Sequence, residues 1–209
     1  MAAAKNLALE NNNLIQNLLG DTDIYLIDQI MKGRYKANDK VLDAGCGNGR
    51  NLHWFLQNKI EIIGVDRDRE AITRLKNKYP GLTADSFLVA EVNLLPFPDN
   101  CFDHILSSAV LHFARSTDHF LNMVAEMVRV LKPGGTLFVR MTSDIGIENT
   151  VELIGDGVYI IPDGSKRFLL SRNLLAELMQ QNELSFIAPL KTVNVNDERC
   201  MSTLMLQKK

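Results

Sequence analysis

The sequence has few cysteines, and their arrangement suggests no metal site. Only 3 of its 209 residues are cysteine, and no Cys-x-x-Cys pair occurs. An odd number of widely separated cysteines, here Cys46, Cys101 and Cys200, is typical of reduced thiols inside a cell. We therefore expect a cytoplasmic protein that binds no metal.

Long apolar runs and a strong excess of charge of either sign are also missing. The N-terminus, MAAAKNLALENNNL, has one lysine and no continuous apolar block, so we do not expect a secretory signal. No apolar run is long enough to cross a bilayer. The formal net charge of -2 gives no electrostatic footprint for nucleic acid. These absences predict a protein that contacts neither membranes nor nucleic acid, and they say nothing about its oligomeric state.

Apolar segments alternate with helical patterns along the chain, which predicts parallel strands joined by crossover helices. The last two strands, 184–190 and 200–206, are joined by a polar stretch (194–199) too short for a crossover helix, so they should pair antiparallel. We predict an α/β fold with a doubly wound, mostly parallel, seven-stranded sheet, one antiparallel strand near its edge, and helices on both faces. The expected helices are 6–32 with a break at Gly20-Asp21, 49–58, 68–78, 117–131 and 172–181, and the other strands are 41–42, 62–66, 86–89, 102–107 and 136–141.

The stretch VLDAGCGNGR, from Val41 to Arg50, is the most informative part of the sequence. A strand that delivers an acid into a glycine-rich turn opening a helix is where α/β proteins hold an adenosine cofactor. A dinucleotide-binding turn has its third glycine where this chain has Arg50. The carboxylate of Asp43 would repel a pyrophosphate, but it suits a ligand that carries an ammonium and a sulfonium.

Two further acidic residues follow predicted strands. Asp66 ends a strand about twenty residues after the glycine turn, where an acidic side chain can bind both hydroxyls of a ribose. The alternative for Asp66 is a solvated acid or a helix N-cap. Glu91 follows the next strand, at the rim where an adenine would lie, and its alternative is a surface acid.

The motifs occur in a fixed order between Val41 and Met141: Asp-x-Gly-x-Gly-x-Gly, Asp66, Glu91, FDHILSSAVLHF and LKPGG. As a set they resemble class I S-adenosylmethionine (SAM) methyltransferases, and the chain is similar to the bacterial type 11 and type 12 methyltransferase domains. The resemblance implies a Rossmann-like fold, SAM as the cofactor, and methyl transfer to a small-molecule acceptor. We expect a single domain with a helical cap (1–40), a SAM-binding core (41–142), a candidate substrate lid (143–170) and a C-terminal helix with an antiparallel strand pair (171–209).

The resemblance also implies which residues form the cofactor site. Asp66 would bind the ribose, Glu91 the adenine amino group, and the backbone amide of Val92 an adenine ring nitrogen. The main chain at Ser107 would pass under the methionine moiety, while Arg50 either contacts the cofactor carboxylate or lies on a helix surface. The full expected set is Asp43, Gly45, Cys46, Gly47, Arg50, Asp66, Arg67, Glu91, Val92 and Ser107, with Cys46 as a small filler in the turn.

The acceptor side is less defined. Ser107-Ser108 stands where enzymes that methylate planar amino groups usually have Asn/Asp-Pro-Pro-Tyr/Phe, and it supplies no acid to hold magnesium, so we expect metal-independent transfer. His112 is the candidate general base, needed only if the nucleophile arrives protonated, and its alternative is a capping or packing histidine. Tyr25 and Arg140 are candidate substrate residues; the alternatives are packing for Tyr25 and pairing with a carboxylate for Arg140.

Two other functions remain as alternatives. A SAM-binding sensor or pseudoenzyme would carry the same cofactor motifs but would retain the cofactor without turnover. A nicotinamide-dependent oxidoreductase is disfavoured, because its turn requires the glycine that Arg50 replaces.

Overall fold

The computed structural model describes residues 14–209, and it confirms the expected break in the first helical stretch. Residues 14–19 are helical, and the chain turns at Gly20, whose φ of 56° lies in the left-handed region that favours glycine. Helix α2 (Ile24–Met31) then begins, with Asp23 as its N-cap. The part of the expected helix before residue 14 lies outside the described residues. In the described part of the chain, no helix is long and apolar enough to cross a membrane.

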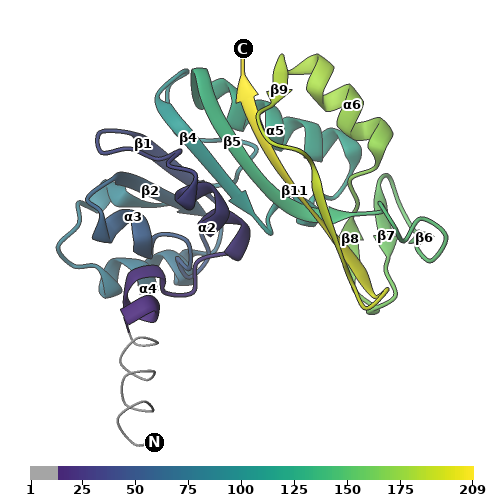
Figure 1. Ribbon diagram of the computed structural model, residues 1–209, viewed down its shortest axis with the longest axis horizontal. Coiled ribbons are helices and arrows are strands. Elements are labelled where there is room, and N and C mark those ends of the chain that lie inside the picture. The colour runs from purple at the N-terminus through teal and green to yellow at the C-terminus, as the bar shows by residue number, and fades with distance from the viewer. Residues whose placement is uncertain (1–13) are drawn as a thin grey trace, which may run out of the picture.

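Five strands form the parallel half of one mixed sheet (Figure 1): β1 (Lys40–Ala44), β2 (Glu61–Asp66), β3 (Phe87–Val89), β4 (Phe102–Ser108) and β5 (Leu131–Ser143). Their order across the sheet is β3-β2-β1-β4-β5, and they run parallel, as the alternating pattern predicts. The register places Asp43 of β1 between Gly64 of β2 and Leu106 of β4. The strand order therefore reverses between β1 and β4, the switch point at which open α/β sheets bind ligands.

The other half of the sheet is antiparallel. Strand β11 (Arg199–Lys208) pairs antiparallel with β5, and along its other edge it pairs with β10 (Lys191–Val195) and then β9 (Leu184–Phe186). The expected antiparallel pairing is confirmed, but the seventh position of the sheet is divided between two short strands. The expectation of a single strand over 184–190 was wrong, because the chain leaves the sheet after β9 and returns at β10.

Helices cover both faces of the sheet, as expected. Helices α3 (His53–Gln57) and α4 (Arg69–Lys78) lie with α2 on one face, and α5 (Thr117–Val130) and α6 (Arg172–Gln181) on the other (Figure 1). Successive strand residues alternate between the two cores: Val41 packs on the α2–α4 face and its neighbour Leu42 on the α5–α6 face. The two faces are therefore separately filled with apolar side chains.

Helix α3 is shorter than the expected helix over 49–58. The preceding turn uses three glycines with positive φ, Gly45 at 85°, Gly47 at 52° and Gly49 at 77°. A backbone in this region cannot form regular helix, so α3 begins only at His53. The helix is short because the residues before it form the open glycine turn.

Residues 143–170 fold into a small antiparallel sheet of β6 (Glu152–Leu153), β7 (Val158–Ile160) and β8 (Lys166–Phe168). The ring of Phe168 stacks on Phe120 of α5, with centroids 4.9 Å apart. The hydroxyl of Thr117, at the start of α5, donates to Asp156 at 2.6 Å. These contacts attach the small sheet to the N-terminal end of α5, beside the lower end of β11 in Figure 1.

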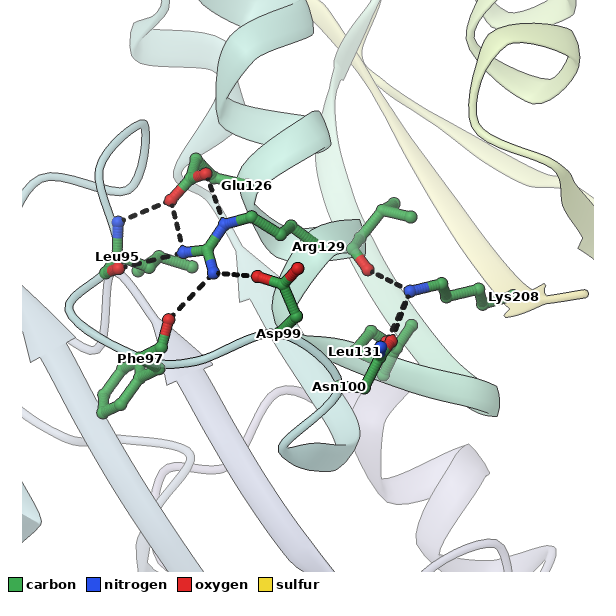
Figure 2. A network of polar contacts seen from close by, with 9 residues as sticks. Leu95, Phe97, Asp99, Asn100, Glu126, Arg129, Leu131 and Lys208 are labelled. Carbon is green, nitrogen blue, oxygen red and sulfur yellow. Dashed lines mark hydrogen bonds and ion pairs between the residues drawn. The ribbon is translucent and has the colours of Figure 1, made fainter.

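The connection from β3 to β4 contains turns and is held by one arginine of α5 (Figure 2). The guanidinium of Arg129 donates to the backbone oxygens of Leu95 and Phe97 at 3.1 and 2.9 Å, and to Asp99 at 2.7 Å. It is itself oriented by Glu126, which also accepts from the backbone N–H of Leu95. This network fixes the loop that directly follows the predicted adenine-binding residues.

Candidate functional site

A cavity of about 620 Å³ opens at the carboxyl ends of β1, β2, β3 and β4. Its wall consists of the turns that follow these four strands, together with side chains from the first two turns of α5 and from the segment before α2. The position agrees with the switch point between β1 and β4. Eight of the residues expected to bind a cofactor line it: Gly45, Cys46, Gly47, Arg50, Asp66, Arg67, Glu91 and Val92.

The glycine turn presents bare backbone to this cavity. A Cβ on Gly45 would come within 2.4 Å of Val110 Cγ2, so the turns after β1 and β4 touch where only glycine fits. At Gly47, no described heavy atom lies within 4 Å of the position that a Cβ would take. The turn is therefore closed on one side by β4 and open on the other, toward the cavity.

Asp66 is bonded to the glycine turn. Its Oδ2 accepts from the backbone N–H of Gly47 at 2.8 Å, and its Oδ1 accepts from the N–H of Asp68 at 2.9 Å. The N-cap of α4 is Asp68, not Asp66, so the helix-capping alternative for Asp66 does not hold. A carboxylate has about four lone-pair sites, which leaves acceptor capacity on the cavity side.

Asp43 does not line the cavity, because it is buried at the end of β1, directly before the turn. Its carboxyl is 1% exposed, and Oδ2 has no hydrogen-bond partner among residues 14–209. Burial raises the pKa of this carboxyl to about 7, against the lowering effect of Arg50 and with a further increase from Asp66. Asp43 is thus a buried acid whose pKa is raised toward neutral pH and whose Oδ2 lacks a partner in the described chain.

Cys46 behaves as the expected filler. Its sulfur lies 2.9 Å from the position that a Cβ on Gly64 would take, so the thiol occupies the space left by that glycine. Burial raises the pKa of the thiol, which keeps it protonated. All three cysteines, each within the described range, are free thiols.

A buried carboxylate that the sequence did not single out connects α2 to the site. Asp23 pairs with Arg50 at 3.1 Å and with Arg140 at 3.4 Å, and its side chain is 3% exposed. Arg50 also donates to the hydroxyl of Ser108 at 2.8 Å, and the guanidinium of Arg140 lies 5.1 Å from the ring centre of Tyr25. We call these five residues the Asp23 cluster.

The Asp23 cluster decides between the alternatives for two arginines. Arg50 lines the cavity rather than the outside of a helix, and Arg140 pairs with a carboxylate, which was the alternative to a contact with substrate. Neither Arg140 nor Tyr25 lines the cavity, although both belong to the cluster that includes the lining residues Arg50 and Ser108. Ser107 is completely buried, and its neighbour Ser108 lines the cavity in its place.

His112 lies in the short 3-10 helix η2 (Leu111–Phe113), just after β4. It is buried, and its Nδ1 has no hydrogen-bond partner in the part of the chain that the structure covers. Burial lowers the pKa of His112 to about 4, and the guanidinium groups of Arg167, Arg140 and Arg199 act in the same direction. The ring is therefore neutral at neutral pH. His112 is not among the residues that line the cavity, but its neighbour Phe113 is, and the two ring centroids lie 4.5 Å apart.

Several lining residues were not foreseen from the sequence. His119 and Met123 come from one face of α5, and Asn51 lines the cavity while its side chain accepts from the backbone N–H of Asp23. Ala109 has a φ of 63°, which is a strained backbone for a non-glycine residue. The spacing of His119 and Met123 on the expected helix over 117–131 was the one available signal, since residues four apart share a helix face.

The central part of the chain is similar in sequence to known proteins. Residues 42–139 match the protein family described as "Methyltransferase domain". The chain is 29% identical to 27-O-demethylrifamycin SV methyltransferase of Amycolatopsis mediterranei over 60% of its own length and 49% of that protein. It is 34% identical to tRNA (carboxymethyluridine(34)-5-O)-methyltransferase of Arabidopsis thaliana over 48% of its own length and 23% of that protein. The chain thus spans about half the length of the first of these relatives and less of the second.

A solved structure is similar over nearly the whole chain. It is a SAM-dependent methyltransferase from Methanosarcina mazei, with a TM-score of 0.67 and 20% sequence identity, covering 86% of this chain and 96% of that one. At this identity the similarity shows the fold, and it confirms the Rossmann-like arrangement expected from the sequence.

Proposed function

Residues 42–139 belong to the SAM-dependent methyltransferase domain family, and on that premise we propose that this protein transfers a methyl group from SAM to a small-molecule acceptor without a metal ion. The observation that carries the proposal is the bond from Gly47 N–H to Asp66, which joins the open glycine turn to the acid of the next strand at one cavity. Such a pair places glycine backbone and a carboxylate at the same edge of the sheet.

The residues present fit this cofactor. Gly47 leaves open space beside the cavity, and the buried Asp43 has an oxygen without a partner in the described chain. We assign the main chain of Gly45, Cys46 and Gly47 to the amino-acid end of the cofactor, with Asp43 as the buried acid near its ammonium. Asp66 would accept from the ribose hydroxyls, with Arg67 beside it.

The remaining cofactor contacts come from the turns after β3 and β4. Glu91 would accept from the adenine amino group, and the N–H of Val92 would donate to a ring nitrogen. Arg50, held by Asp23 and Ser108, would meet the cofactor carboxylate. The main chain at Ser107 would lie under the methionine moiety.

When bound, SAM supplies a methyl group on a sulfonium that is already an activated leaving group. The protein's task is then to align the nucleophile and to exclude water. We propose that His112 accepts the proton of an acceptor that arrives protonated, because its ring is neutral at neutral pH. Metal independence is supported by the donor set after β4, where Ser108, Ala109 and Val110 offer the cavity no carboxylate.

We place the acceptor beside Phe113, whose ring lines the cavity and is half exposed. The guanidinium of Arg167, from β8, lies 5.2 Å from the centre of this ring. That contact supports a substrate-facing role for residues 143–170, and we keep Tyr25 and Arg140, which contact each other in the Asp23 cluster, as candidate substrate residues. The relatives described above act on different acceptors, a rifamycin and tRNA, so family membership identifies the methyl donor but not the acceptor. The net charge of -2 favours a small molecule over nucleic acid.

The proposal is tested by incubating the protein with methyl-labelled SAM and, separately, a metabolite extract and total tRNA. We expect the label to appear in a small molecule, to persist with a chelator present, and to disappear when the Asp66→Asn variant replaces the unaltered protein. Label in tRNA alone would contradict the small-molecule proposal. Tight cofactor binding without transfer to either pool would identify a sensor instead of an enzyme.

A further inference from the structure

One cavity-lining side chain has a polar atom that nothing in the proposed function uses. His119 lies in the first turn of α5, and Met123, one turn later, lines the same cavity. The lining residues from the turn after β3 are Ala90, Glu91 and Val92. Glu91 is close enough to His119 for its charge to raise the pKa of the ring. The turn after β3 and the start of α5 thus form one end of the cavity, beyond the turn after β2 that carries Asp66.

The hydrogen bonds of His119 determine which nitrogen carries the proton. Its Nδ1 lies 3.1 Å from the backbone nitrogen of Arg115, and a backbone N–H can only donate, so Nδ1 accepts. Burial and the charge of Arg115 lower the pKa of His119, which keeps the ring neutral at neutral pH. A neutral ring that accepts at Nδ1 carries its proton on Nε2.

This Nε2–H donor is buried, and it has no acceptor within the chain from residue 14 onward. Leaving a buried donor unpaired costs roughly 1–3 kcal/mol, so such an atom in a side chain that lines a cavity indicates a ligand that accepts the bond. The bond at Nδ1 leaves the proton on Nε2, and both His119 and Glu91 line the cavity. The two side chains therefore offer one donor and one acceptor to the same end of the cavity.

We propose that His119 donates through Nε2–H to a ring nitrogen of the cofactor's adenine and, together with Glu91, selects adenine over other bases. Adenine presents an amino donor next to ring-nitrogen acceptors, which is the complement of a carboxylate beside an N–H. Hypoxanthine carries a carbonyl oxygen in place of the amino group, and Glu91 would repel it. The inference rests on the proposed function, since it assumes that the adenosine of SAM occupies this cavity.

The test measures binding, not turnover. Calorimetric titration compares S-adenosylhomocysteine with its 1-deaza, 3-deaza and 7-deaza analogues, each of which lacks one ring acceptor. Besides the analogue that lacks the ring nitrogen assigned to Val92, we expect the unaltered protein to bind a second analogue about tenfold more weakly, the size of a single hydrogen bond. The His119→Phe variant should bind S-adenosylhomocysteine more weakly by a similar factor and should no longer discriminate against that analogue.

Two further variants separate recognition from packing. His119→Gln keeps a donor at a similar distance and should restore part of the discrimination. Met123→Leu, which changes the same wall without removing a donor, should weaken all four ligands alike. An unchanged ranking of the analogues in folded His119→Phe would overturn this inference alone. No binding of S-adenosylhomocysteine by the unaltered protein would overturn the proposed function and this inference with it.

Discussion

The buried carboxyl of Asp43 lowers the stability of the fold at neutral pH. The carboxyl is buried at the end of the central strand, and burial raises its pKa to about 7. In the unfolded chain the pKa of aspartate is near 3.9. Between these two values the folded protein binds more protons than the unfolded chain, so its stability must decrease as the pH rises.

Asp43→Asn should therefore remove a pH dependence. For the unaltered protein we expect the free energy of unfolding to decrease between about pH 4 and pH 7 by up to about 4 kcal/mol, and to change little from this group above pH 7. The variant should show a flatter profile, higher stability at pH 8 and weaker SAM binding. Urea unfolding at pH 5 and pH 8 measures this, and equal slopes for the two proteins would contradict it.

Gly47 and Gly33 form a matched pair for testing whether the glycine turn binds the cofactor. Both have positive φ, 52° and 65°, and neither has a described heavy atom within 4 Å of a prospective Cβ. Alanine at either position should cost about 1 kcal/mol of stability, because of the left-handed backbone. Only Gly47→Ala places a methyl group at the cavity, so only this variant should lose SAM affinity in a calorimetric titration. A similar loss of SAM affinity for Gly33→Ala would refute the assignment of the glycine turn to the cofactor.

At the scale of single residues, the sequence identified side chains that follow strands directly. Asp66 and Glu91 are such residues, since a strand end fixes where the next side chain lies. Asp23 and His119 reach the site from helices packed over the sheet. Their positions depend on how α2 and α5 dock, and no local pattern reports that.

Helix α2 is attached to the site by the Asp23 cluster. The buried carboxylate of Asp23 neutralises two guanidinium groups, and its other oxygen caps the helix by accepting from Tyr25 N–H at 2.9 Å. Removing one member of a buried ion pair leaves a charge without a partner, which is strongly destabilising. The position of the helix and the orientation of Arg50 therefore depend on one side chain.

Asp23→Ala should lower the free energy of unfolding by about 3 kcal/mol. Asp23→Asn should lose about 1 kcal/mol less, because asparagine still caps the helix. As a control, Glu61→Gln breaks an exposed pair with Lys40 at 3.2 Å and should cost less than about 1 kcal/mol. Urea unfolding followed by circular dichroism gives all three values; equal losses for the Asp23 and Glu61 variants would contradict a role for the cluster.

At the scale of elements, helices with periodic apolar faces were predicted well and segments governed by turns were not. Helix α5 matches its expected range within a residue, because Ser116 caps it and apolar residues recur along it. Helix α3 is short because of the glycine conformations before it, and β9 and β10 are separate because pairing with β11 sets their limits. Such limits depend on partners distant in the sequence.

The architecture of the whole molecule follows from the order of its motifs. Alternating strands and helices imply a parallel sheet, and right-handed crossovers constrain how consecutive strands are placed. The reversal between β1 and β4 brings four strand ends to one cavity. Within the candidate lid, residues 143–170, the strands are only two or three residues long, too short to leave a periodic pattern in the sequence.

The most direct test is a crystal structure of the protein grown with S-adenosylhomocysteine. Our account predicts the ribose hydroxyls on Asp66, the amino-acid end at the turn from Gly45 to Gly47, and the adenine between Glu91 and His119. A cavity that stays empty at saturating ligand, or that takes up NAD in preference, would contradict it.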